Sequence, residues 1–297
     1  MQTALLASVE SVLAIPEWVS YIIAFAFGTC IGSFLNVVIY RVPNEKSLLT
    51  GSACPNCQTA IRFYHNVPIL GWLMLSGKCA SCKEPISWRY PAIEALTGLV
   101  FLIVFMQIGL TPYLPVALAF VSAMIALIFI DAEHMILPNV ITYPLFVIAL
   151  IVRIVFPIAF AGTNYFSDTT YSPIALLQGY PAWVISLAGA LFGALIGGGS
   201  LWLVGALWKV LRGVDAMGLG DVKLLFGIGA LLGWRLTILT IFLGAFTGAL
   251  AGIVIVMRQK NKDMQAQVPF GIFLGIGSII ALLFGDRMIA WYLGSFM

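Results

Sequence analysis

Two carboxylates embedded in apolar sequence are the residues of this chain best suited to carry out chemistry. Asp131 directly follows the apolar run 116–130, and Asp221 lies in the segment MGLGDVK (217–223), which has apolar sequence on both sides. A charged residue at the centre of a membrane helix costs roughly 2.5–3.5 kcal/mol, so such residues are usually functional. Paired carboxylates can divide the roles of acid and base in an attack by water. We therefore predict acid–base chemistry at Asp131 and Asp221.

Each of these features also has a structural interpretation that the sequence leaves open. Asp221 could be only the N-cap of the helix that follows it. Gly218 and Gly220 could simply break the loop, or they could let an extended substrate approach closely as part of an active-site loop. Lys223 could belong to the same loop or anchor the chain at the membrane surface. The polar segment 131–134 could be the ordinary interfacial end of a helix.

The composition places the chain among membrane proteins. Of its 297 residues, 61% are hydrophobic and only 9% are charged, and the mean hydropathy is +1.04. Soluble domains carry about 25% charged residues, and a membrane helix needs about 20 apolar residues. We predict an all-α polytopic membrane protein with about eight transmembrane helices, and an interfacial helix within 1–15. The net charge of +3 is too diluted to indicate nucleic acid binding. The predicted spans are 18–40, 92–110, 115–131, 140–160, 182–207, 222–234, 236–257 and 270–285.

Basic residues predict how these helices are oriented. Lys and Arg are enriched in short cytoplasmic loops; they gather in 41–91, 208–223 and 258–268, whereas 154–208 contains none. We expect the basic segments to face the cytosol and the loop 162–180 to face outside. Both carboxylates would then lie at similar depth near the inner membrane surface.

Residues 41–91 form a polar insertion with two C-x-x-C pairs, Cys54 with Cys57 and Cys79 with Cys82. Four thiolates from two such pairs form the tetrahedral shell that Zn²⁺ prefers. A closed four-sulfur site would be structural, and the metal would supply folding energy to an insertion with little core. Two disulfides are disfavoured in a reducing cytosol, and an iron–sulfur cluster or a redox dithiol stays open. We predict a zinc-ribbon-like cytosolic insertion.

Motifs of other enzyme classes are not found in the sequence. The chain has only two histidines, His65 and His134, and no H-E-x-x-H motif, which argues against a catalytic metal site. It also has no G-x-S-x-G elbow. No G-x-G-x-x-G turn supports a standard cofactor-binding fold. Acid–base catalysis by the two aspartates remains the strongest interpretation.

Six segments, in order along nearly the whole chain, resemble the type IV prepilin peptidases, the bacterial membrane aspartyl proteases of the GxGD class. The matching segments are 32–41 (GSFLNVVIYR), the two C-x-x-C pairs, Arg89-Tyr90-Pro91 with Glu94, Ile130-Asp131 with Leu137-Pro138, 218–223 (GLGDVK) and Pro269-Phe270-Gly271.

The resemblance implies that Asp131 and Asp221 are catalytic. It further implies removal of the basic leader of type IV prepilins or type II secretion pseudopilins, at the cytosolic face of a bacterial inner membrane. Many members then methylate the new N-terminus with S-adenosylmethionine, and the cysteine-bearing insertion is implicated in that step. One departure is Asn139, where the family usually has Asp; it casts little doubt on proteolysis because both aspartates are intact.

The expected organisation has three parts. Residues 1–40 hold the N-terminal segment and first span, 41–91 the tetracysteine insertion, and 92–297 the transmembrane protease core. The expected partners are prepilins or pseudopilins and membrane lipid. A competing hypothesis is a non-enzymatic transporter or scaffold with a zinc-ribbon docking domain, because transporters also bury carboxylates. A third hypothesis is that the chain is a methyltransferase alone.

Overall fold

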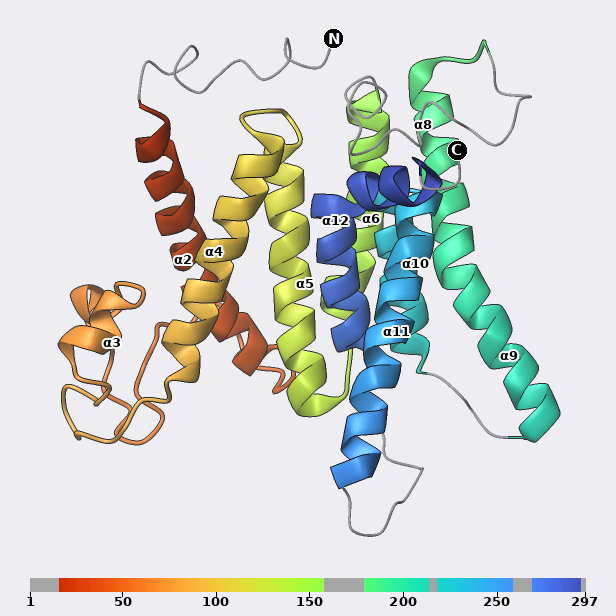
Figure 1. The fold of residues 1–297 in the computed structure, drawn as a ribbon. Helices are drawn as coiled ribbons and strands as arrows, with labels where there is room; N and C mark the ends of the chain where they lie inside the picture. The colour runs from red at the N-terminus through yellow and green to blue at the C-terminus, as the bar shows by residue number, and fades with distance from the viewer. Residues whose placement is uncertain (1–15, 158–178, 214–217, 259–268, 295–297) are drawn as a thin grey trace. The chain divides into compact units, whose positions relative to one another are not determined.

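The computed structural model describes residues 16–157, 179–213, 218–258 and 269–294 (Figure 1). The chain forms two compact units, Met1–Ala126 and Leu127–Met297. The boundary lies within helix α5 (Leu114–His134), which therefore contributes to both units. Each unit is described separately below.

The first unit is built on a pair of packed helices, α2 (Glu17–Arg41) and α4 (Arg89–Ile108). Gly32 of α2 allows the two backbones to approach closely, because a Cβ atom there would lie 2.7 Å from the Cα of Glu94. Small residues permit this kind of contact between membrane helices. The amide of Asn36 joins the same two helices by donating to the carbonyl of Tyr90 at 3.1 Å.

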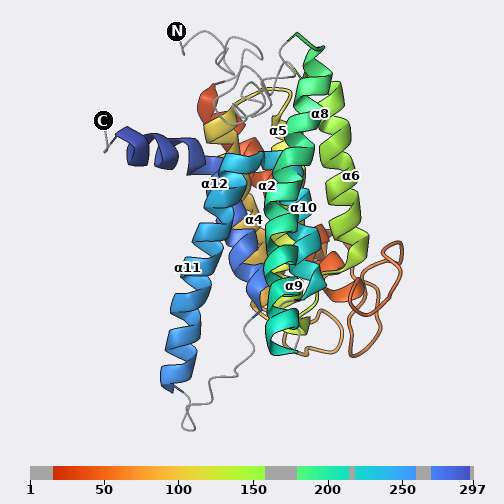
Figure 2. The same ribbon diagram turned by 90° about the vertical axis from the view of Figure 1, so that its right-hand side faces the viewer.

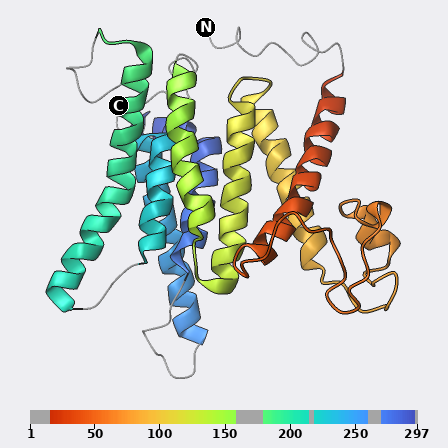
Figure 3. The same ribbon diagram turned by 180° about the vertical axis from the view of Figure 1, so that it is seen from behind.

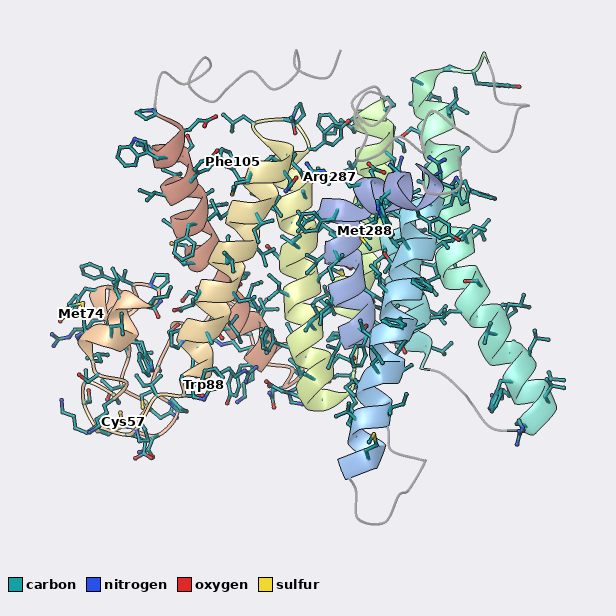
Figure 4. The ribbon with its side chains drawn as sticks, in the orientation of Figure 1. Cys57, Met74, Trp88, Phe105, Arg287 and Met288 are labelled. Atoms are coloured by element: carbon teal, nitrogen blue, oxygen red, sulfur yellow. The ribbon has the colours of Figure 1, made fainter. Side chains whose placement is uncertain are left out.

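The polar insertion lies between α2 and α4 and contains two short helices, η1 (Phe63–His65) and α3 (Leu70–Met74). Figure 4 shows Cys57 and Met74 within it, and Trp88 where it meets α4. The guanidinium of Arg41 holds its first loop by donating to the carbonyls of Ser47, Thr50 and Gly51. The indole of Trp72 donates to the carbonyl of Ile86 at 3.0 Å. The insertion is thus held by hydrogen bonds to its backbone.

The second unit surrounds helix α10 (Leu219–Leu232), which is buried along most of its length. Helix α10 contacts α6 (Asn139–Val155), α8 (Ala182–Ala194), α11 (Trp234–Arg258) and α12 (Phe270–Gly294). Seen from behind, α6 runs alongside α8 (Figure 3). Because α10 begins with Asp221 in its first turn, this packing determines where that carboxylate lies.

Helix α8 continues through a π-helical turn, η4 (Leu195–Gly199), into α9 (Ser200–Arg212), and the three form one long helix beside α10 (Figure 2). Gly193 and Gly229 bring α8 and α10 together, because a Cβ atom on either would collide with the carbonyl of the other. Single π-helical turns are rare and are often found near functional sites.

Each of the eight predicted spans contains a helix among its described residues, and six of the described helices are long and apolar enough to cross a membrane. Helix α6, with 17 residues, and α10, with 14, are shorter. At 1.5 Å per residue, α10 is about 21 Å long, less than the roughly 30 Å of the hydrocarbon core. The predicted helix within 1–15 and nearly all of the loop 162–180 lie outside the described residues.

Arg153 of α6 explains how a helix as short as α10 can end in an apolar environment. Its side chain is fully buried, and it donates to the carbonyls of Ala230 and Leu231 at 3.2 and 2.9 Å. The last carbonyls of a helix have no partner within the helix, and lipid cannot supply one. The guanidinium supplies these hydrogen bonds and places a positive charge at the negative end of the helix dipole.

Candidate active site and metal centre

Asp131 lies in the last turn of α5 and is only 5% exposed. The prediction that the helix ends at Asp131 is wrong by one turn, because α5 continues to His134. The Oδ2 atom of Asp131 accepts a hydrogen bond of 3.1 Å from the backbone N–H of Ile272, in the first turn of α12. The amide of Gly271 also donates to it. Two amides of a distant helix therefore hold this carboxylate in place.

Asp221 is the third residue of α10, and the interpretation of Asp221 as the N-cap is wrong. Gly218 occupies the N-cap position, and the helix has no side-chain cap. The backbone N–H of Asp221 donates to the carbonyl of Gly218 at 3.2 Å. Its carboxylate is thus not used for capping, and it lies within electrostatic reach of Asp131.

Leu137 lies in the connection from α5 to α6. It packs against the first turns of both α10 and α12. A Cβ atom on Gly220 would lie 3.1 Å from the Cβ of Leu137. A Cβ atom on Gly271 would lie 3.1 Å from the Cδ1 of Leu137 and 2.8 Å from Oδ2 of Asp131. Glycine at these two positions therefore lets the starts of α10 and α12 pack closely against Leu137, and Gly271 also lets α12 approach Asp131.

The other predicted loop residues have different surroundings. Gly218 lies beside the Asp221 carboxylate, with Oδ2 3.9 Å from the position of an added Cβ. Lys223 points instead towards α6, where its ammonium group donates to Oδ1 of Asn139 at 3.0 Å and lies 5.2 Å from the ring centroid of Tyr143. The structure thus brings Gly218 and Gly220 to the carboxylate pair and places Lys223 against α6.

Sequence reasoning assigned no role to Leu137, Gly271 or Ile272, which complete the surroundings of Asp131. Leu137 and Gly271 were noted only as parts of short motifs that carry a family resemblance. The contact between Ile272 and Asp131 spans 141 residues of sequence. A pairing of that range leaves no local pattern, and only the Pro-Phe-Gly sequence at the start of α12 marks the place.

Four cysteine sulfurs gather in the insertion, as the spacing predicts. The Sγ atoms of Cys54, Cys57, Cys79 and Cys82 all lie within 4.8 Å of one another. The Sγ atoms of Cys54 and Cys82 are 3.8 Å apart, and those of Cys57 and Cys79 are 4.0 Å apart. A tetrahedron with metal–sulfur distances of about 2.3 Å has edges of about 3.8 Å. All four cysteines are free in this structure, and these sulfur separations exceed the roughly 2.05 Å of a disulfide bond.

The two cysteine pairs sit on matching backbone turns. The amide of Gln58 donates to the carbonyl of Cys54, and the amide of Lys83 donates to the carbonyl of Cys79. Both Gln58 and Lys83 have positive φ angles, 56° and 62°. Hydrogen bonding with Thr59 lowers the pKa of the Cys57 thiol to about 6. Backbone hydrogen bonds also lower the pKa of the Cys79 thiol. The pKa of Cys82 is raised to about 11: the backbone of Glu84 hydrogen-bonds to this thiol, but burial and the neighbouring thiols outweigh that contact. A thiolate is the form that binds metal, so Cys57 and Cys79 are the thiols best prepared for metal binding.

The described residues therefore define an all-helical membrane protein with a tetracysteine cluster and a carboxylate pair, of which Asp131 is buried and Asp221 partly buried. Family models match both parts of the chain: the Bacterial Peptidase A24 N-terminal domain at residues 26–108, and the Type IV leader peptidase family at residues 118–253. The chain belongs to the type IV leader peptidase family and is an enzyme.

Relatives with the name prepilin leader peptidase/N-methyltransferase match over almost their whole length. The protein from Pseudomonas aeruginosa is 36% identical over 290 residues, which cover 90% of this chain and 91% of the relative. The protein from Aeromonas hydrophila is 33% identical, and the match covers 94% of this chain and 96% of the relative. That from Neisseria gonorrhoeae is 34% identical, covering 96% and 97%. No solved structure matches the chain.

Proposed function

We propose that this enzyme removes the leader peptide of type IV prepilins, or of type II secretion pseudopilins, by a water attack between Asp131 and Asp221. The observation that carries the proposal is the fixed position of Asp131. Its carboxylate is held by the first amides of α12 while the carboxylate of Asp221 lies within electrostatic reach. The names of the relatives supply the substrate class.

The proposed reaction needs one proton to be shared by the pair, because two neighbouring carboxylates cannot both be ionised at low cost. The ionised member takes a proton from water as the water oxygen attacks the scissile carbonyl carbon. The protonated member donates to the carbonyl oxygen, and a proton then passes to the departing amine as the C–N bond breaks. Gly218 and Gly220 leave room beside Asp221 for an extended peptide.

The proposal places the substrate at the cytosolic face of a bacterial inner membrane. The basic loops on either side of α10 and α11 support that orientation, since positive loops are retained in the cytosol. The apolar segment of the substrate would lie in the lipid beside the enzyme, with its basic leader in the cytosol. Methylation of the new N-terminal amine by S-adenosylmethionine would follow, as the names of the relatives suggest.

Zinc is the metal that the four cysteines fit best, because two of the sulfur separations, 3.8 and 4.0 Å, lie close to the edge of a Zn–S₄ tetrahedron and all four sulfurs lie within 4.8 Å of one another. Cys54, Cys57, Cys79 and Cys82 would hold it. Its contribution would be structural, joining the two C-x-x-C turns of an insertion that has few buried apolar residues.

Leader cleavage by the purified enzyme tests the aspartyl mechanism. A type IV prepilin is incubated in detergent with wild type, Asp131→Asn, Asp221→Asn and the control Glu133→Gln, an exposed carboxylate two residues from Asp131. We expect both Asp variants to lose cleavage by at least about 10⁴-fold, while Glu133→Gln retains it. Size-exclusion elution and thermal unfolding should match wild type. Cleavage by folded Asp variants would make the carboxylates structural, and an inactive wild type would favour the transporter or scaffold hypothesis.

A further inference from the structure

Glu94 is a buried carboxylate that the proteolytic site does not use. It lies on α4, in the first unit, and is only 8% exposed. Its Oε2 atom accepts a hydrogen bond of 2.7 Å from the backbone N–H of Ile69, and the hydroxyl of Ser33 on α2 provides a second hydrogen bond. Both donors are neutral. Within the described ranges, no Lys, Arg or His forms an ion pair with Glu94.

A buried charge without an opposite charge is unfavourable, and native proteins usually pair it or give it a ligand. The two neutral hydrogen bonds orient the Glu94 carboxyl group but supply no opposite charge that would stabilise its ionised form. The chemistry that would complete this environment is a cation, which the described part of the first unit does not itself supply.

The contact with Ile69 is made at a strained turn. Ile69 has φ 60° and ψ −53°, and the amide of Leu70 donates to the carbonyl of Pro68 across it. This is a γ-turn of the rare strained kind, at a β-branched residue that seldom adopts positive φ. Strained residues persist only where surrounding contacts hold them, and they gather at functional sites. The Ile69–Glu94 hydrogen bond is one contact that holds this turn.

The surroundings of Glu94 join the cysteine-bearing insertion to the membrane helices. Ile69 belongs to the insertion, whereas Ser33 and Glu94 belong to α2 and α4. Tyr90, one turn before Glu94 on α4, is 43% exposed, and residues four apart share a helix face. We call Ser33, Ile69, Tyr90 and Glu94 the Glu94 cluster. It combines a carboxylate with an aromatic ring, both of which attract organic cations.

We propose that the Glu94 cluster binds the sulfonium group of the methyl donor S-adenosylmethionine, with the Glu94 carboxylate facing the positive sulfur. The inference rests on the methylation step of the proposed function. It adds a binding site to that step, since S-adenosylmethionine is a cation at sulfur and Glu94 is a buried carboxyl group to which the described residues bring no cationic partner.

The charge balance of methyl transfer fits this arrangement. The new N-terminal ammonium group loses a proton to solvent, and the resulting amine uses its lone pair to form the N–C bond. The C–S bond breaks with its electrons on sulfur, which becomes a neutral thioether, and the positive charge passes to the methylated nitrogen. A carboxylate beside the sulfur therefore holds the charged donor more tightly than the neutral S-adenosylhomocysteine product, which favours product release.

Binding of the donor and the product to the full-length protein tests the inference. Equilibrium dialysis in detergent measures radiolabelled S-adenosylmethionine and S-adenosylhomocysteine on wild type, Glu94→Gln, Glu94→Asp and Glu45→Gln. Glutamine keeps the acceptor for the Ile69 amide, and Glu45 is an exposed carboxylate of the same unit. We expect Glu94→Gln to weaken S-adenosylmethionine binding about tenfold or more and to leave S-adenosylhomocysteine binding nearly unchanged. Glu94→Asp should retain part of the preference for S-adenosylmethionine over S-adenosylhomocysteine, and Glu45→Gln should retain all of it.

Leader cleavage, measured in parallel, separates this inference from the proposed function. Glu94→Gln should cleave a prepilin at the wild-type rate, because the carboxylate pair lies in the second unit. The role of Glu94 would be overturned if Glu94→Gln bound the charged donor and its neutral product more weakly by the same factor. It would also be overturned if the variant bound both as tightly as wild type does. A cleavage defect with unchanged donor binding would overturn it too, and would assign Glu94 to the basic leader. Failure of wild type to bind the donor would overturn the inference together with the methylation step, while cleavage would still report on the protease.

Discussion

At the scale of single residues, the position of Asp131 depends on atoms that are far away in the sequence. Its Oδ2 atom is held by the amide of Ile272, 141 residues further along the chain. Gly271 leaves the space that this contact requires, because a Cβ atom there would lie only 2.8 Å from the carboxylate oxygen Oδ2. The geometry of a proposed water attack is therefore set by a glycine that takes no part in proton transfer.

Substitution of Gly271 by alanine should reduce catalysis more than stability. The new Cβ would lie 2.8 Å from Oδ2 of Asp131, so the carboxylate or the start of α12 must move. A displacement of about 1 Å at a catalytic group can cost about 10²-fold in rate. We expect kcat for leader cleavage to fall by about that factor, with little change in KM or in the unfolding temperature.

Gly252→Ala is the matched control for that experiment. Gly252 lies on α11 with open space around the position of its Cβ, so we expect activity like that of wild type. Equal activity of Gly271→Ala and wild type would contradict the close approach of α12 to Asp131.

At the scale of helices, the sequence predicts where the apolar elements lie but not how they are held. Each of the eight expected spans contains a helix among its described residues, because runs of apolar residues of this length favour helices in lipid. The four-cysteine cluster also follows from local spacing. The contact of Arg153 with α10 does not follow from local spacing, since it joins residues 77 and 78 positions apart.

Glu94 belongs to a motif that the sequence shows, but its burial without an opposite charge depends on how α2, α4 and the insertion pack.

The C-terminal end of α10 provides a prediction about helix stability. Arg153→Met would retain the apolar volume of the side chain but leave the carbonyls of Ala230 and Leu231 without their donor. An unsatisfied buried acceptor costs roughly 1–3 kcal/mol. We therefore expect the free energy of unfolding in detergent, measured by urea titration, to fall by a similar or larger amount.

Arg153→Lys should recover part of that loss, since a lysine can donate to one of the two carbonyls. The exposed Arg212, which lies over the ring of Trp208 at 5.3 Å, supplies the control substitution Arg212→Met. A stability loss as large for Arg212→Met as for Arg153→Met would show that the effect is a general one of removing arginine.

At the scale of the whole molecule, the two proposed activities belong to different compact units. The cysteine cluster and Glu94 lie in the first unit, and Asp131 and Asp221 lie in the second. The insertion connects to the membrane helices partly through the Ile69–Glu94 hydrogen bond. Loss of structure in the insertion should therefore act on methyl-donor binding before it acts on peptide cleavage.

Removal of the metal tests this division. Cys57→Ser takes one sulfur from the cluster, and Cys30→Ser is the control, because Cys30 is an exposed cysteine on α2 outside the cluster. We expect zinc content, measured by elemental analysis, to be one ion per wild-type chain and to fall strongly in Cys57→Ser. Limited proteolysis should then cut within 41–91, because the metal supplies much of the folding energy of such a small segment.

In Cys57→Ser, S-adenosylmethionine binding should fall together with the zinc content, while leader cleavage persists. Equal loss of cleavage and donor binding in Cys57→Ser, with Cys30→Ser unaffected, would mean that the metal stabilises both units and that the two activities do not separate.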